Sequence, residues 1–138
     1  MQKTSKILMT AAAAVLAGFP AFSADLPDSL SEHLWQNRPL IVFADTPEDP
    51  RLIRQLELLD LGQADLDERD VVVIVDTDGN SDNPMREALR PRGFTWVLIG
   101  KDGTVKLRKP HPWTTRELGR VIDKMPLRQQ EMRQRWEK

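Results

Sequence analysis

The sequence predicts an α/β domain with a mixed central sheet of about four strands, helices on both faces and an additional C-terminal helix. Apolar runs of strand length at residues 40–44, 71–75 and 94–99 alternate with segments of helical periodicity. A hairpin turn and a fourth strand follow the third run. Because this order combines a parallel crossover with a hairpin, the sheet must contain both parallel and antiparallel pairs.

The N-terminal segment is typical of a secretory signal peptide. Lys3 and Lys6 precede a charge-free apolar run over residues 7–22 that ends in small residues. We expect cleavage after Ser23, with a cut after Ala24 as the neighbouring alternative. The chain is therefore predicted to be exported, either periplasmic or secreted, without a stable membrane anchor after cleavage.

Length and composition exclude several classes of protein. Residues 24–138 are enough for a single domain, with a core over residues 38–125 and a helical extension over residues 126–138. The chain has no cysteine, which excludes disulfides, thiol catalysis and thiolate-bound metal centres. Its formal charge is −1, and loss of two lysines with the signal peptide makes it −3. This charge gives no electrostatic basis for a nucleic-acid partner.

Capping residues mark the first two helices. Ser29 and Glu32 form a capping-box pattern, which predicts a short helix that ends near Asn37. The apolar run 40–44 follows and is typical of a strand buried on both faces. Next, Asp49 and the proline after it predict the start of a helix whose leucines repeat at helical spacing up to a glycine stop.

The middle of the chain predicts a strand and a short helix. Residues 71–75 are almost all β-branched, which predicts a second central strand. Asn83 followed by Pro84 predicts the beginning of a helix that buries Met85 and Leu89.

The last third of the chain predicts a hairpin and two helices. Residues 94–99 and 104–107 predict strands joined by a turn over residues 101–103. Thr114 and Glu117 form a second capping-box pattern at the start of a helix. A proline interrupts that helix, and the polar tail after it is prone to form a helix in which Met132 and Trp136 are expected to make the main apolar contacts.

This order of elements, together with residues 92–105, which read RGFTWVLIGKDGTV, resembles the second half of a thioredoxin. The resemblance covers most of residues 38–125 and implies a thioredoxin-like fold. Four further segments resemble an uncharacterised bacterial family of exported thioredoxin-like domains, related to the domain in secreted sushi-repeat proteins. They are NRPLIVFA at 37–44, ERDVVV at 68–73, LIGKDG at 98–103 and MPLRQQEM at 125–132. The family implies a fold and a compartment but no agreed activity.

The chain departs from thioredoxins at both parts of the redox site. The position of the two redox cysteines, at the start of the helix after the first central strand, is occupied by Pro47, Glu48, Asp49 and Pro50. Thr95 replaces the proline that precedes the third strand in thioredoxins. We therefore expect neither thiol–disulfide oxidoreductase nor thiol peroxidase activity.

The acidic loop after residue 75 is a candidate calcium site. Asp76, Asp78 and Asn80 match positions 1, 3 and 5 of a calcium-binding loop, and Glu87 falls at position 12. Against this interpretation, position 6 is Ser81 where the loop requires glycine. Turn chemistry alone also produces loops that are rich in Asp, Gly and Asn.

Basic residues near the predicted hairpin are a candidate partner face. Lys106 and Arg108 lie close in sequence to Trp113, and a charged face of this kind could bind a partner. Charges that protect an edge strand would give the same pattern. The two histidines, His33 and His111, are isolated from other metal ligands, so the sequence predicts no zinc site.

The sequence thus predicts an exported, cysteine-free, thioredoxin-like domain that serves as a non-catalytic binding or structural module in the cell envelope. Its partner would be an unknown protein or a small ligand. The alternative is an enzyme of unknown reaction that uses the former redox-site pocket around Asp45, Glu48 and Thr95.

Overall fold

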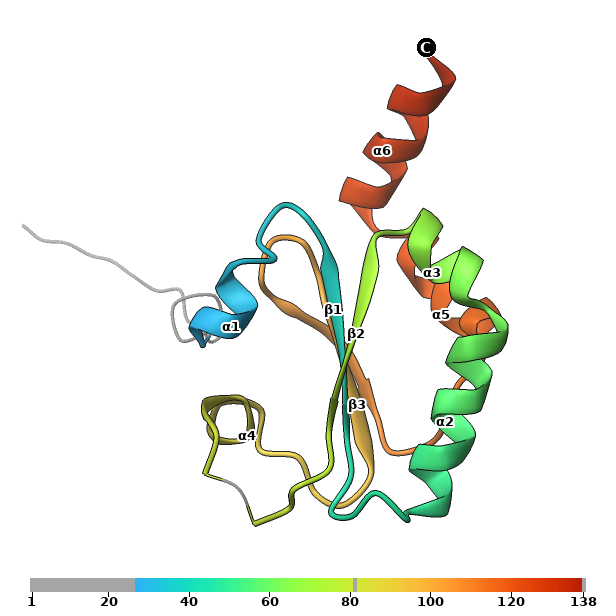
Figure 1. Ribbon diagram of the computed structural model, residues 1–138. Coiled ribbons are helices and arrows are strands. Elements are labelled where there is room, and N and C mark those ends of the chain that lie inside the picture. The colour runs from blue at the N-terminus through green and yellow to red at the C-terminus, as the bar shows by residue number, and fades with distance from the viewer. Residues whose placement is uncertain (1–26, 81, 138) are drawn as a thin grey trace, which may run out of the picture.

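The computed structural model describes residues 27–80 and 82–137, so the predicted signal peptide and its cleavage site lie outside the described residues. A mixed four-stranded sheet forms the centre of the fold, in the order β2-β1-β3-β4 (Figure 1). β1 pairs in parallel with β2 and antiparallel with β3, which in turn pairs antiparallel with β4. The strands span Arg38–Phe43 (β1), Val71–Asp76 (β2), Thr95–Ile99 (β3) and Val105–Lys109 (β4). The predicted α/β fold class is confirmed.

Two apolar cores lie on opposite faces of the sheet. Leu40 and Val42 of β1 belong to one core, whereas Ile41 and Phe43 belong to the other. Because successive side chains of a strand point to opposite faces, a central strand covered on both sides needs a continuous apolar run. All six residues of β1 are accordingly buried.

Helices cover both faces of this sheet (Figure 1). One face carries α2 (Pro50–Leu61), α3 (Gln63–Glu68) and α5 (Thr115–Asp123). The short helices α1 (Asp28–Ser31) and α4 (Pro84–Leu89) lie on the other face. The chain ends in α6 (Pro126–Trp136), which extends beyond the sheet.

Most predicted caps form, and one does not. Asp49, Asn83 and Thr114 each accept a backbone hydrogen bond at the start of α2, α4 and α5, as predicted. The capping box predicted at Ser29 is wrong, because the N-cap of α1 is Pro27, two residues earlier in the chain. The carbonyl oxygen of Pro27 accepts the first helical hydrogen bonds, so the helix closes without a side-chain cap.

The prediction of a second central strand at residues 71–75 is wrong in its position. β2 has β1 as its one strand neighbour among the described residues, and Val75 is 43% exposed. A β-branched run indicates a chain that fits a pleated surface, and this preference does not distinguish an edge strand from a central one. Helix α3, between α2 and β2, was not predicted because its six residues carry little apolar periodicity.

Helix α6 is held by ion pairs. Trp136, expected to pack on the domain, is 90% exposed, so that prediction is wrong. Instead, Arg128 of α6 and Arg38 at the start of β1 are both buried. The Arg38 guanidinium donates hydrogen bonds of 3.1 and 3.3 Å to the two carboxylate oxygens of Glu131 in α6. A charge pair therefore connects the central strand to the C-terminal helix.

Further cations and carboxylates extend this pair into a network. The Lys101 ammonium lies 2.8 Å from carboxylate oxygens of both Glu131 and Asp70. On the other side, Arg128 lies 3.1 Å from Asp123 and 3.3 Å from Glu68. The network joins the start of the sheet, the β3–β4 turn, α3, α5 and α6.

The network keeps its carboxylates ionised. Burial alone would raise the pKa of Glu131, but hydrogen bonds from Lys101 and Arg38 outweigh burial and lower this pKa below its usual value of 4.5. Hydrogen bonds from Arg69 and Arg128 likewise lower the pKa of Asp123. These carboxylates bind protons more readily in the unfolded chain, so falling pH favours unfolding.

We predict that Glu131→Gln destabilises the fold and flattens its pH dependence. Removal of one partner leaves the buried Arg38 guanidinium without its counter-charge, at a cost of about 3 kcal/mol in the free energy of unfolding. Wild-type stability should fall as the pH drops below about 4.5, because the pKa of Glu131 is lower in the folded state. Urea unfolding from pH 6 to pH 3 measures both effects. As a control, Glu137→Gln should change stability by less than about 0.5 kcal/mol, and equal pH slopes for wild type and Glu131→Gln would contradict the prediction.

Candidate functional site

The former redox end of the fold is occupied by structural side chains. Asp49 accepts a 2.9 Å hydrogen bond from the backbone N–H of Arg51 and forms an ion pair of 3.1 Å with its guanidinium. The hydrogen bond from the Arg51 side chain is the main cause that lowers the pKa of Asp49. Pro47 and Glu48 are exposed in the turn before α2. Asp49 therefore starts the helix, as carboxylates at an N-cap ordinarily do.

Thr95 lies near the start of α2, but its hydroxyl is already hydrogen-bonded. It is 7% exposed, and its Oγ1 lies 2.8 Å from the carbonyl oxygen of Phe94 and 3.1 Å from that of Arg92. No cis peptide bond occurs among the described residues. Arg51 of α2 stacks 5.6 Å above the Phe94 ring, so the structure brings the two parts of the former redox site near each other. The Thr95 hydroxyl is engaged by backbone carbonyls.

The acidic loop is organised around an arginine. Asp76, at the end of β2, accepts hydrogen bonds of 3.1 Å from Arg86 Nε and from the backbone N–H of Asp78, and a further bond from the Asn83 amide. Burial would raise the pKa of Asp76, but these hydrogen bonds outweigh it and lower the pKa. Arg86 also donates a 2.8 Å bond to the carbonyl of Ala44. The Asp76 carboxylate thus connects β2 to α4 and to the end of β1.

The other predicted calcium ligands do not gather around Asp76. Asp78 accepts a hydrogen bond from the backbone N–H of Asn80, and Glu87 lies in the first turn of α4. In residues 27–80 and 82–137, no group of three or more His, Cys, Asp or Glu side chains is placed to hold a metal ion. Calcium binding at this loop stays a prediction.

The residues of the expected partner face lie in three different places. Lys106 pairs with Asp102 at 3.0 Å, whereas Arg108 donates a 2.8 Å hydrogen bond to the carbonyl of Leu89 in α4. Trp113 is half-buried and packs edge-to-face on Trp96, with ring centroids 5.2 Å apart. Trp113 therefore contributes to the core, and the three side chains do not form one surface.

A basic hollow of about 310 Å³ lies over Thr95. Its lining comes from the segment after α4 and from the end of β4, and consists of Arg90, Arg92, Thr95, Arg108, Lys109 and Pro110. This lining places cations, rather than Asp45 or Glu48, around Thr95. Asp45 is directed instead to the acidic loop, where its backbone carbonyl accepts a hydrogen bond from Gly79.

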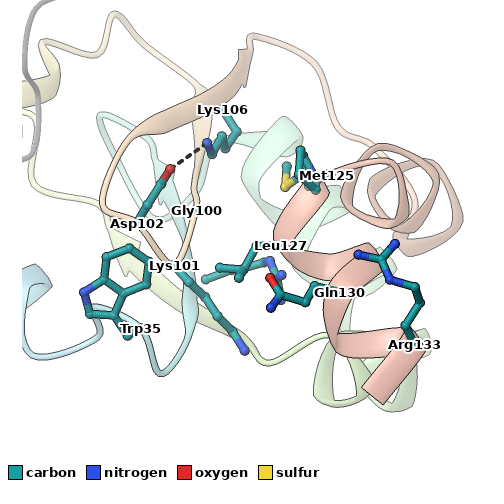
Figure 2. Close-up of a pocket in the computed structure, with 11 residues that line it drawn as sticks. Trp35, Gly100, Lys101, Asp102, Lys106, Met125, Leu127, Gln130 and Arg133 are labelled. Carbon is teal, nitrogen blue, oxygen red and sulfur yellow. Dashed lines mark hydrogen bonds and ion pairs between the residues drawn. The ribbon is translucent and has the colours of Figure 1, made fainter. Parts of the chain in front are cut away.

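A larger cavity of about 450 Å³ lies at the opposite end of the sheet (Figure 2). We call it the Trp35 cavity. The loop before β1, the β3–β4 turn and the first turns of α6 form its walls, as the close-up shows. Its lining consists of Trp35, Arg38, Gly100, Lys101, Asp102, Lys106, Met125, Pro126, Leu127, Gln130 and Arg133. Its volume is in the range typical of small-molecule sites.

Trp35 has two unusual properties. Its φ is +65°, a left-handed conformation that β-carbon-bearing residues rarely adopt. Its side chain is large and apolar, yet the residue is 68% exposed. A 2.7 Å hydrogen bond from its backbone N–H to the carbonyl of Lys101 holds this conformation. The fold thus presents an indole to solvent at the cost of backbone strain.

The charged side chains that line the Trp35 cavity differ in whether they are paired. Lys101 is bound within the ion network, and Lys106 pairs with Asp102 at the surface. Burial would raise the pKa of Asp102, but hydrogen bonds from Thr104 and Lys106 outweigh it and lower this pKa. Arg133 has no side-chain hydrogen bond or ion pair within the described part of the chain. Its guanidinium faces solvent at the edge of α6.

The four segments that carried the family resemblance all contribute to this end of the fold. Arg38, Asp70, Lys101 and Glu131, one from each segment, meet in the ion network next to the Trp35 cavity. The sequence reasoning did not identify this site, because it searched for catalytic and metal-ligating patterns. A tryptophan in a polar segment just before a strand was the available signal.

The fold is similar to that of several solved structures. A reduced 2-Cys peroxiredoxin of Plasmodium vivax has a TM-score of 0.54 and 14% identity, with 68% of this chain and 80% of that chain covered. Thioredoxin-2, from malaria parasite protein secretion machinery, has a TM-score of 0.53 and 17% identity, with 64% and 84% covered. Thioredoxin peroxidase I of Plasmodium yoelii has a TM-score of 0.51 and 18% identity, with 68% and 75% covered. At these identities the likeness establishes the thioredoxin-like fold alone.

No curated protein matches the chain. None of the helices within residues 27–80 and 82–137 has the length and apolar character needed to cross a membrane. A family model described as a domain of unknown function, DUF4174, matches residues 29–131. Because the match covers most of the chain, this protein belongs to the DUF4174 family.

Proposed function

We propose that this protein is an exported, non-catalytic binding module of the cell envelope, and that the Trp35 cavity is its ligand site. The observation that carries the proposal is the strained, exposed Trp35 at the mouth of a cavity of about 450 Å³. Strained residues persist where the surrounding structure fixes them, and they are enriched at functional sites. Large exposed apolar side chains beside a cavity are likewise typical of binding sites.

The non-catalytic character is supported by the chemistry of the former redox end. The chain has no cysteine to carry a thiolate, so electrons cannot pass through a dithiol. Asp49 serves as an N-cap, and the Thr95 hydroxyl is engaged by main-chain carbonyls. Within residues 27–80 and 82–137, the hydrogen-bond partners of these two side chains are Arg51 and main-chain groups, none of which is a base that would activate a nucleophile.

Export is supported by the N-terminal sequence and by the family resemblance. Two lysines, an apolar run and small residues before Asp25 form the three regions of a signal peptide. A cysteine-free domain needs no oxidative folding, so it folds equally well in the periplasm and outside the cell. The resemblance to exported bacterial domains and to secreted sushi-repeat proteins agrees with this compartment.

The second candidate function is an enzyme at the former redox end. The basic hollow over Thr95 favours it, because an anionic substrate would be attracted to the arginines there. The carboxylates of Asp45 and Glu48, which this enzyme would use, are not part of the lining of the hollow. We therefore place the function at the Trp35 cavity.

We predict that the chain is exported and processed. Expressed in full in a Gram-negative host, it should be found in the periplasm or medium with an N-terminus at Ala24, or at Asp25. Leu16→Arg places a charge in the apolar run and should keep the full-length protein in the cytoplasm. Thr4→Arg, which adds the same charge before that run, should leave export intact. Fractionation and N-terminal sequencing measure the outcome, and an unprocessed cytoplasmic wild type would contradict export.

We predict that ligands of this protein act through the Trp35 cavity. Compounds that bind the native state raise its apparent Tm, so a thermal screen of small metabolites identifies ligands of any chemical class. Any compound that raises the wild-type Tm should lose this effect in Trp35→Asn and keep it in Glu48→Gln and Thr95→Val. The reverse pattern would place the function at the former redox end and favour the enzyme.

A further inference from the structure

We propose that the Trp35 cavity binds a small amphipathic anion, an organic molecule with one carboxylate or phosphate group on an apolar body. This inference rests on the proposed function, which assigns ligand binding to the cavity, and it adds the chemical class of the ligand. The lining has apolar and cationic side chains, and each set selects one part of such a molecule.

The apolar part of the lining consists of the exposed indole of Trp35 and of residues at the start of α6. Met125 and Leu127 are half-buried and line the cavity on the side of that helix. Figure 2 shows the Trp35 side chain and these residues on different sides of the space. A hydrocarbon chain or a ring between them would remove apolar surface from water on both sides.

The cationic side chains available to a ligand are Lys106 of β4 and Arg133 of α6. Lys106 pairs with Asp102 at a half-exposed position, and such pairs contribute little stability, so a ligand anion can compete for the ammonium. Arg133 has no partner within the described residues, and its guanidinium fits an oxyanion in a two-pronged geometry. Of the cations that line the cavity, Lys106 and Arg133 are therefore the two that can bind a ligand anion.

The acidic side chains near the cavity already accept hydrogen bonds from neighbouring groups. Asp102 accepts hydrogen bonds from Thr104 and Lys106, and Glu131 is bound by Arg38 and Lys101. A cationic ligand would have to compete with Lys106 and with two Thr104 donors for Asp102, the one carboxylate among the residues that line the cavity, and it would still face Arg133. The electrostatics thus favour an anion over a cation or a neutral amphipath.

The substitution Trp35→Asn tests the inference most directly. Asparagine adopts the left-handed conformation far more readily than tryptophan, so Trp35→Asn relieves strain and removes an exposed apolar surface. The hydrogen bond from residue 35 to Lys101 uses the backbone and is kept. The variant should have a Tm equal to or above that of the wild type, and it should nevertheless lose ligand binding. A residue with a merely structural role would lower the Tm when replaced.

The experiment uses decanoate as the probe, with decanol and decyltrimethylammonium as neutral and cationic partners of equal chain length. In isothermal titration calorimetry below the micelle-forming concentrations, the exported protein should bind decanoate, and it should bind the other two at least about tenfold more weakly. Trp35→Asn and Arg133→Gln should each weaken decanoate binding by about tenfold or more. Two matched controls, Trp136→Asn and Arg116→Gln, alter an exposed tryptophan and an exposed arginine outside the cavity and should leave binding unchanged.

Three outcomes would overturn the proposed ligand class. Each of them also shows whether the proposed function of the cavity fails together with the ligand class. If decanol or decyltrimethylammonium binds as tightly as decanoate and Trp35→Asn abolishes that binding, the cavity binds ligands but does not select anions. If decanoate binds and Trp35→Asn has no effect, the binding lies elsewhere and both inferences fail. Binding to phosphatidylglycerol vesicles without binding to decanoate would also overturn the assignment, because a bilayer surface and not a free anion would be recognised.

Discussion

The buried pair of Arg38 and Glu131 is the constraint on which this end of the molecule depends. Arg38 begins the central strand, and its guanidinium, 1% exposed, needs a counter-charge because isolated buried charges are strongly unfavourable. Glu131 supplies it from α6, a helix whose terminal Trp136 contacts so little that it remains exposed. The Nε of Arg38 is nevertheless a buried donor without a hydrogen-bond partner among the described residues. Such a network is a poor source of net stability, and its consequence is geometric, since it determines where α6 lies.

That geometry creates the Trp35 cavity. Because ion pairs rather than close apolar packing hold α6, its first turns leave a space between Leu127 and the β3–β4 turn. At the other end of the sheet, where thioredoxins carry their cysteines, Asp49, Thr95 and Asp76 are all engaged in caps, carbonyl contacts or an arginine pair. The end of the sheet at which thioredoxins carry their cysteines is thus occupied by structural contacts, and an open cavity lies at the other end.

Local features of the sequence predicted local features of the fold. The starts of α2, α4 and α5 were predictable because a cap depends on residues within one turn, as at Asp49 and Asn83. The positions of β2 and α6 were not, because they depend on partners distant in the chain. A β-branched run has the same appearance at an edge and in the centre. The separation of 93 positions between Arg38 and Glu131 likewise hides their pairing from any local pattern.

The candidate site could not be predicted for a related reason. Its distinguishing feature is a positive φ at a large and exposed apolar residue, Trp35, and backbone strain has no signature in composition or periodicity. Sequence reasoning associates this conformation with glycine or asparagine, so it does not expect a positive φ at a tryptophan before a strand. The contrast between the expected residue type and the observed one is itself informative. Asparagine would fill position 35 with less strain, and the exposed indole that stands there contributes little to the core. A ligand in the adjoining cavity, as we propose, would give this indole a function that packing does not.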